Sequence, residues 1–177
     1  HNQGSDFNQR ELTEKVNTPE RNYTIVNKYL EHAKGRPFIA FCVDVQHTVD
    51  LCEAFNEKGV KASYVVGDKL LTPDRHKIIN AFKSQGYSLE EAEGLINCMI
   101  ATEGFDFANI GCVILACPTK SKVKFWQTIV RGLRLKDLYF VSLFGQNCII
   151  LDIVDNTTKH RVITCEGEDA LLPLDEK

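Results

Sequence analysis

The segment from Lys120 to Lys136 holds the most informative group of candidate functional residues in the chain. It contains six Lys or Arg residues and no acid, although the chain as a whole has a net charge of −3. On a helix with 3.6 residues per turn, Gln127, Arg131 and Arg134 fall within one stripe. Two arginines three residues apart, one turn after a planar amide, can bind phosphate oxygens through paired hydrogen bonds. The spacing therefore indicates a phosphate-binding surface.

This helix is expected to run from Lys122 to about Leu135. Its opposite side carries Phe125, Ile129 and Leu133, which we expect to pack against the core. A basic stripe of this kind is also typical of a helix face that is simply solvated, and the sequence alone leaves that alternative open.

A second candidate segment follows an apolar run that ends near residue 101. Thr102, Glu103, Gly104 and Asp106 place a hydroxyl, two carboxylates and a glycine within five positions. A glycine there lets the backbone approach a ligand, and residues that follow buried strands often carry function. The alternative is that Thr102 and Asp106 only cap a turn.

The third candidate pair is Asp44 and His47, directly after the apolar run 38–43. The plainer interpretation of each residue is structural, with Asp44 capping the helix that follows. Both residues would nevertheless lie at the carboxyl end of a strand, where parallel sheets place their working residues.

The elements that must position these residues alternate along the chain. Apolar runs without polar alternation predict strands that are buried on both faces, and these lie at 38–43, 62–66, 96–101, 112–116 and 148–154. Helical periodicity fills the gaps between them, with start signals at Thr18-Pro19-Glu20 and Thr72-Pro73-Asp74. This order predicts an α/β fold, a mostly parallel sheet with helices on both faces.

Composition limits the remaining choices. With 44% hydrophobic and 25% charged residues, the chain has the composition of a globular protein, and no apolar stretch reaches the length of a membrane span. Seven cysteines, mostly within apolar runs and without a C-x-x-C pair, indicate reduced thiols and a cytoplasmic location. We expect a polar lead-in over residues 1–17, one domain over 18–165 and an acidic tail over 166–177, with the two ends frayed or acting as connectors. The apolar segment 138–146 is either a packing surface for a neighbour or a variable strand.

Several motifs are absent from the sequence. It has no G-x-x-x-x-G-K-[ST] phosphate loop and no H-E-x-x-H or C-x-x-C motif, so we expect no metal site. Its one Asp-Glu pair, Asp175-Glu176, lies at the extreme carboxyl end. The chain by itself thus lacks the parts that hold a nucleoside triphosphate and Mg²⁺.

Together, these segments resemble the carboxyl-terminal RecA-like domain of superfamily 2 helicases of the DEAD/DEAH type, and most closely the restriction-enzyme and excision-repair branch. The matching stretches are Arg36 to Cys42 for motif IV, Thr102 to Asp106 for motif V, Pro118 to Ser121 for the P-T-x-S segment, and Gln127 to Arg134 for motif VI. The order of these stretches makes the resemblance specific, since each alone is weak.

The resemblance implies a three-layer RecA-like fold and a role in an ATP-dependent nucleic-acid helicase or translocase, a hydrolase of ATP with Mg²⁺. It implies that Arg134 is an arginine finger, that Arg131 and Gln127 also face the phosphates, and that Gly104, Asp106 and Glu103 lie at the nucleotide. Contacts to the backbone of a nucleic acid, most simply DNA, are implied for Thr102, His47 and Lys120.

The partner implied is an amino-terminal RecA-like domain of the same enzyme, which would supply the phosphate loop. The chain alone is then expected to be inactive and to hold no tightly bound cofactor, and no membrane partner is expected. A nucleotide-independent binding or adaptor domain that kept only the fold is the alternative.

Overall fold

The computed structural model describes residues 9–67, 72–84, 93–98 and 107–156, and for residues 9–11 and 84 the backbone only. Within these ranges five short strands form one parallel sheet, in the order β2-β3-β1-β4-β5. The strands are β1 (Phe38–Phe41), β2 (Ala62–Val65), β3 (Gly94–Asn97), β4 (Cys112–Leu115) and β5 (Ile149–Asp152). All five overlap the predicted strands. The largest shift is in β3, which begins two residues earlier than predicted, and residues 99–101 of that prediction lie outside the described residues.

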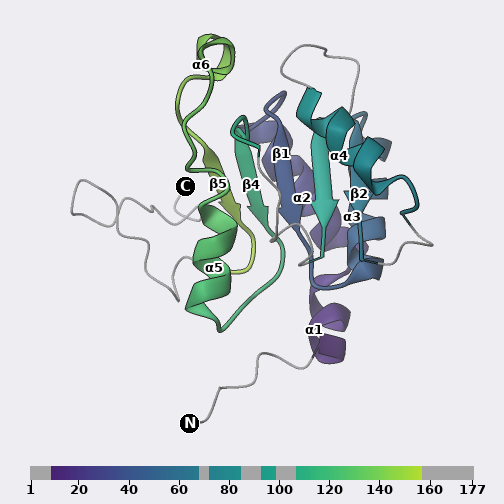
Figure 1. Cartoon of the computed structure of the whole chain (residues 1–177). Coiled ribbons are helices and arrows are strands. Elements are labelled where there is room, and N and C mark those ends of the chain that lie inside the picture. The colour runs from purple at the N-terminus through teal and green to yellow at the C-terminus, as the bar shows by residue number, and fades with distance from the viewer. Residues whose placement is uncertain (1–8, 68–71, 85–92, 99–106, 157–177) are drawn as a thin grey trace.

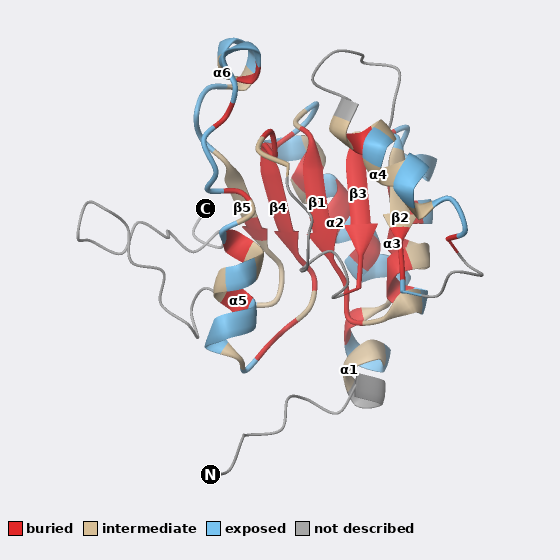
Figure 2. Ribbon diagram, in the orientation of Figure 1, coloured by how far each residue is buried: buried red, intermediate tan, exposed pale blue. Residues whose placement is uncertain are grey.

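Helices cover both faces of the sheet, so the predicted α/β architecture is confirmed. Figure 1 shows α2 (Pro19–His32) and α3 (Val45–Glu57) behind the sheet, and α4 (Arg75–Ser84) and α5 (Lys122–Ile129) in front of it. Two separate groups of buried side chains fill the two spaces between the layers. The three inner strands β1, β3 and β4 are buried throughout, as predicted, whereas the edge strands β2 and β5 are only partly buried (Figure 2). Parallel strands buried on both faces produce the continuous apolar runs seen in the sequence.

The helix starts follow the capping chemistry expected from the sequence. Thr18 accepts a hydrogen bond from the backbone N–H of Arg21, with Pro19 at the first helical position. Asp44 accepts one from the N–H of His47 at 2.8 Å. The interpretation of Asp44 as the cap of α3 is thereby confirmed.

Two helices lie where other structure was expected. Part of the predicted lead-in forms α1 (Gln9–Val16), and Val16 at its end is buried. The segment 138–146 forms α6 (Leu138–Phe144), capped by Asp137 and ended by Gly145 at φ +74, so the strand alternative is wrong. Apolar runs of seven residues fit both kinds of element, and the capping contacts decided the outcome.

The outer edge of β2 is partly closed by side chains. The amide of Asn56 bonds to both backbone groups of Ala62, donating to its carbonyl at 3.0 Å and accepting from its N–H at 3.2 Å. The hydroxyl of Thr72 donates to the carbonyl of Val66 at 3.0 Å. These bonds take the place of a further strand at both ends of this edge.

Candidate nucleotide-facing surface

The loop before α5 is fixed by a residue far along the chain. Asn156, which is buried, accepts from the N–H of Thr119 at 2.9 Å and donates to the carbonyl of Cys117 at 2.9 Å. The hydroxyl of Thr119 then accepts from the N–H of Ser121, and Ser121 caps α5 by accepting from Lys124 N–H. A series of hydrogen bonds within the P-T-x-S segment thus determines where α5 begins.

The helix that begins there is shorter than predicted. It ends at Ile129, and the chain continues as a series of turns from Val130 to Arg134. The hydrogen bond of Val130 reaches back four residues, whereas those of Arg131, Gly132 and Leu133 reach back only three. The predicted helix over 122–135 is therefore wrong in its last six residues.

Gly132 provides the physical reason. A Cβ atom at this position would lie 2.5 Å from the sulfur of Cys148 and 2.9 Å from Cγ2 of Val113. The backbone of Gly132 therefore packs directly on the sheet, closer than any side chain allows, and the helix tightens to reach it. As a result, Leu133 does not pack with Phe125 and Ile129 as predicted but is 62% exposed.

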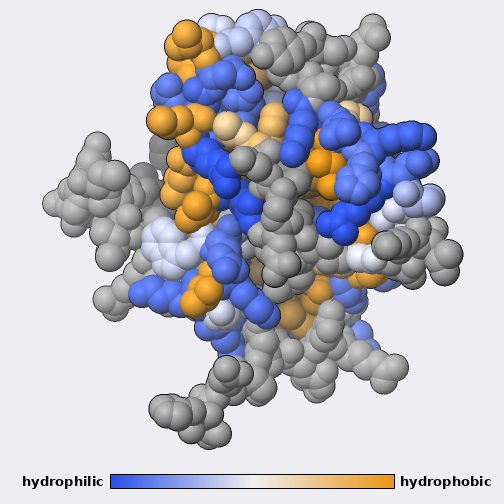
Figure 3. Space-filling model, viewed as in Figure 1, coloured by the Kyte–Doolittle hydropathy of each residue, from blue (hydrophilic) through white to orange (hydrophobic). Residues whose placement is uncertain are grey.

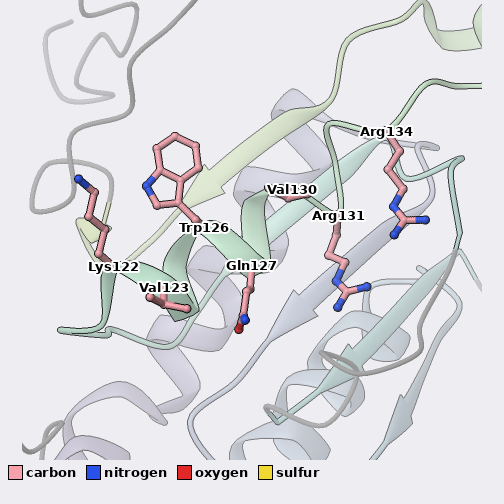
Figure 4. A pocket seen from close by; sticks show the side chains of 7 residues that line it. All are labelled: Lys122, Val123, Trp126, Gln127, Val130, Arg131 and Arg134. Carbon is pink, nitrogen blue, oxygen red and sulfur yellow. The ribbon is translucent and has the colours of Figure 1, made fainter. Parts of the chain in front are cut away.

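The predicted phosphate-binding residues nevertheless come together. Gln127 from the helix, with Arg131 and Arg134 from the turns, lines one open concavity of about 620 Å³. In Figure 4 these three side chains extend in the same direction. Lys122, Val123, Trp126 and Val130 complete its wall.

This concavity combines cationic and apolar walls. Gln127 and Arg134 are exposed and Arg131 is half-buried, so the guanidinium groups border solvent rather than the core. Guanidinium groups presented in this way can bind an anionic ligand that approaches from outside the domain. Lys120 is also exposed, in the loop before α5.

His47 does not fit its predicted contact with nucleic acid. Its side chain is fully buried, and Nδ1 accepts a hydrogen bond from the N–H of Val43 at 3.4 Å, while Nε2 has no hydrogen-bond partner among the described residues. Burial lowers the pKa of His47 from its ordinary 6.5 to about 4, so the ring is neutral at pH 7. We correct the prediction: this histidine belongs to the interior next to the cap of α3.

The remaining predicted site residues, Thr102, Glu103, Gly104 and Asp106, lie outside the described residues. The next described residue is Phe107, whose ring packs edge-on against the Phe82 ring with centroids 5.3 Å apart. Sequence reasoning missed Asn156 as an anchor of the P-T-x-S loop. The only signal available was an amide residue just after the last strand.

The thiols described by the structure, at positions 42, 52, 98, 112, 117 and 148, are all free, as the sequence predicted. Burial raises the pKa of the Cys42 and Cys112 thiols well above the ordinary value, which keeps them protonated and unreactive. Among the described residues, His, Cys, Asp and Glu side chains form no group of three or more that could hold a metal ion. None of the described helices is long and apolar enough to cross a membrane.

Comparison with known proteins agrees with this geometry. The helicase conserved C-terminal domain matches residues 21–136. IRC3 of Saccharomyces cerevisiae, named as an ATP-dependent helicase, is 38% identical over 133 residues, which cover 73% of this chain and 18% of that protein. A Schizosaccharomyces pombe protein, irc3, named as a mitochondrial ATP-dependent helicase, is 31% identical over 86% of this chain and 23% of its own length. The chain thus spans about a fifth of the length of these relatives.

Solved structures show the same fold. A fragment named as an HsdR subunit of a type I restriction enzyme from Vibrio vulnificus YJ016 superposes with a TM-score of 0.67 at 18% identity, covering 92% of this chain and 31% of that one. A DEAD box protein from Methanococcus jannaschii superposes with a TM-score of 0.57 at 21% identity, over 80% of this chain and 35% of that one. With its five-stranded parallel sheet and the match over residues 21–136, the chain belongs to the family of helicase conserved C-terminal domains and has the RecA-like fold of superfamily 2 helicases.

Proposed function

We propose that this domain is the carboxyl-terminal half of the motor of an ATP-dependent nucleic-acid helicase or translocase, and that Arg134 is its arginine finger. The observation that carries the proposal is the convergence of Gln127, Arg131 and Arg134 on one open concavity. The names of the two fungal relatives support ATP as the nucleotide.

The chemistry follows from the guanidinium groups. Negative charge spreads over the oxygens of the transferred phosphoryl group in the transition state, and a fixed cation in a water-poor cleft stabilises it. Arg134 would supply that cation, while Arg131 and Gln127 would hold the ground-state phosphates. The concavity is open, and in this proposal another domain would supply the other wall of the cleft.

We assign that wall to an amino-terminal RecA-like domain of the same protein, which would carry the phosphate loop and hold Mg²⁺ with ATP. Gly104, Asp106 and Glu103 would meet the nucleotide from the present domain. Thr102 and Lys120 would contact the phosphates of a nucleic acid, with DNA as the proposed form, and such contacts do not depend on base sequence.

The test uses the complete two-domain enzyme. Replacing Arg134 by Ala is expected to lower ATP turnover about a thousandfold or more, while the thermal midpoint stays near wild type because the side chain is exposed. Arg134→Lys should rescue poorly, since an ammonium group cannot reproduce the planar fork. Arg21→Ala removes an equally exposed arginine from α2, on the far face of the sheet, and serves as the matched control.

Near-normal turnover in a folded Arg134→Ala enzyme would contradict the assigned role. An adaptor domain predicts a different pattern, in which the complete protein binds nucleic acid without hydrolysing ATP and all three variants behave alike. The isolated chain is expected to show no turnover above a protein-free blank. It should bind single-stranded DNA weakly, with an affinity that falls steeply as salt is raised.

A further inference from the structure

Lys136 lies immediately after the turns that carry the two arginines, and it is buried. Its residue is only 7% exposed, and its Nζ atom donates a hydrogen bond to the carbonyl of Gly132 at 2.8 Å. The aliphatic stem leads the ammonium group to 6.0 Å from the centre of the Phe140 ring. The lysine thus closes a loop over the residues from Gly132 to Lys136, which include Arg134.

A buried lysine with these partners is costly. Within the part of the chain that the structure describes, no carboxylate lies within ion-pair distance of its ammonium group. Burial lowers the pKa of Lys136, the direction expected when the charged form loses hydration. An apolar residue of similar length would fill the same space at a smaller cost in stability. Packing alone therefore does not explain why a lysine occupies this buried position.

The other contacts of this segment hold both of its ends. Gly132 is pressed against Cys148 and Val113 on the sheet, at distances that leave no room for a Cβ atom. Asp137, next to Lys136, forms a reciprocal pair with Asn109: its N–H donates to Oδ1 of Asn109 at 3.1 Å, and its carboxylate accepts from the Asn109 amide. The carboxylate of Asp137 also caps α6 through the N–H of Phe140 at 2.8 Å.

These contacts fix the two ends of the segment, and residues 133–135 run between them. Leu133 and Leu135 are exposed, and their side chains contribute little to holding that path. The hydrogen bond from Lys136 to Gly132 spans the segment and fixes the distance between its two ends. Since Arg131 and Arg134 flank Gly132, the same bond restrains where both guanidinium groups can reach.

We propose that Lys136 is a positioning residue, which holds the turn so that Arg131 and Arg134 reach the same anionic ligand together. This inference rests on the proposed function, because it assumes that the arginines act on nucleotide phosphates. It assigns to Lys136 no contact with the nucleotide.

The experiment is a double-mutant cycle in the complete enzyme, with ATP turnover, the KM for ATP and thermal unfolding measured on the same preparations. Lys136→Met keeps the stem and removes the hydrogen-bond donor. We expect turnover to fall about tenfold to a hundredfold, the loss typical of a misplaced catalytic group, with a smaller change in KM and an unchanged or higher thermal midpoint. Lys34→Met, at an exposed lysine after α2, is the control.

The second arm introduces Lys136→Met into the Arg134→Ala enzyme. If the lysine acts through the arginines, Lys136→Met should lower turnover much less in the Arg134→Ala enzyme than in wild type, because residues that act as a unit are not additive and only the effect through Arg131 remains. Full additivity, or a single Lys136→Met variant with normal turnover, would overturn the positioning role while leaving that of Arg134 intact. Normal turnover in Arg134→Ala would instead overturn the proposed function, and this inference with it.

If Lys136→Met does not fold, Asn109→Ala replaces it in the same cycle. That change removes the pair with Asp137 and loosens the same end of the segment. The expected pattern is identical, a loss of turnover that is much smaller in the Arg134→Ala background than in wild type. An additive loss there would count against the inference in the same way.

Discussion

The two faces of the sheet are built differently. Behind it, Tyr29, Phe38 and Phe55 form an aromatic cluster with ring centroids 4.5, 4.6 and 5.6 Å apart, and all three are fully buried. In front, the chain after α5 departs from regular structure. There the backbone of Gly132, without a side chain, contacts the sheet directly, and Lys136 is buried where an apolar residue would be expected.

Beyond α5 along the chain, apolar side chains are also left in solvent. Leu135 and Leu138 are each 87% exposed, and Leu143 is 54% exposed. Hydrophobic atoms gather over α6 and the chain leading to it, at the upper left of Figure 3. Both layers hold buried side chains, but the rear layer contains the aromatic cluster, whereas the chain after α5 leaves apolar side chains exposed. Substitutions on the two faces should have different consequences.

The largest effect on stability is expected at Phe55. Phe55→Ala removes the ring at the centre of the rear cluster and should lower the free energy of unfolding by about 3–5 kcal/mol, through lost burial and the cavity that remains. Urea unfolding of the isolated domain measures this change. Trp126→Ala on the front face, where the ring is only half-buried, is the matched aromatic truncation and should cost clearly less. Equal losses would show that the two faces are equally well packed.

The next effect is a pH dependence at the rear face. Because the pKa of His47 is about 4 in the folded domain and near 6.5 when unfolded, the unfolded chain takes up a proton first as the pH falls. Stability is therefore retained above pH 6.5 and lost progressively down to pH 4, by about 3 kcal/mol from this residue. Urea unfolding at pH 7, 5.5 and 4.5 should show a shallower loss in His47→Gln than in wild type.

Other groups also titrate in this range, so the comparison needs a control. His32→Gln, which removes an exposed imidazole from α2 beside Glu31, is the matched control. A pH profile of His47→Gln that parallels wild type would mean that the imidazole is not held neutral by burial.

The smallest effect is expected at the exposed leucines. Leu135→Ser and Leu138→Ser should each change the free energy of unfolding of the isolated domain by no more than about 0.5 kcal/mol, because neither side chain is buried. A loss above 1 kcal/mol in the same urea experiment would show that these side chains pack within the domain. That result would contradict the contrast between the packed rear face and the exposed chain after α5.

Most of the fold could be predicted because its signals are local. Continuous apolar runs marked all five strands, and the caps at Thr18 and Asp44 marked two helix starts. The grouping of Gln127, Arg131 and Arg134 was also predicted, although on a longer helix than the one observed. The tightening after Ile129 depends on Cys148 and Val113, which lie far from Gly132 in sequence, and periodicity does not report such contacts.

The burial of His47 was missed for a related reason. A histidine two residues into a helix can face solvent or the sheet, and the packing of α3 against β2 and β3 decides which. The roles of Asn156 and Lys136 rest on hydrogen bonds to backbone atoms, and any amide or lysine can form such bonds. The residue types of Asn156 and Lys136 therefore do not predict these contacts by themselves.

The closure of β2 by Asn56 and Thr72 also bears on how copies of the domain meet. An outer strand that offers a row of unpaired backbone groups can add a strand from another molecule, and this is a common start to aggregation. Here the amide of Asn56 occupies both groups of Ala62, and the hydroxyl of Thr72 occupies the carbonyl of Val66. Side chains therefore hinder two such edges from pairing along their whole length. The β2 edge is thus protected against pairing with another copy at the two positions where side chains occupy its backbone groups.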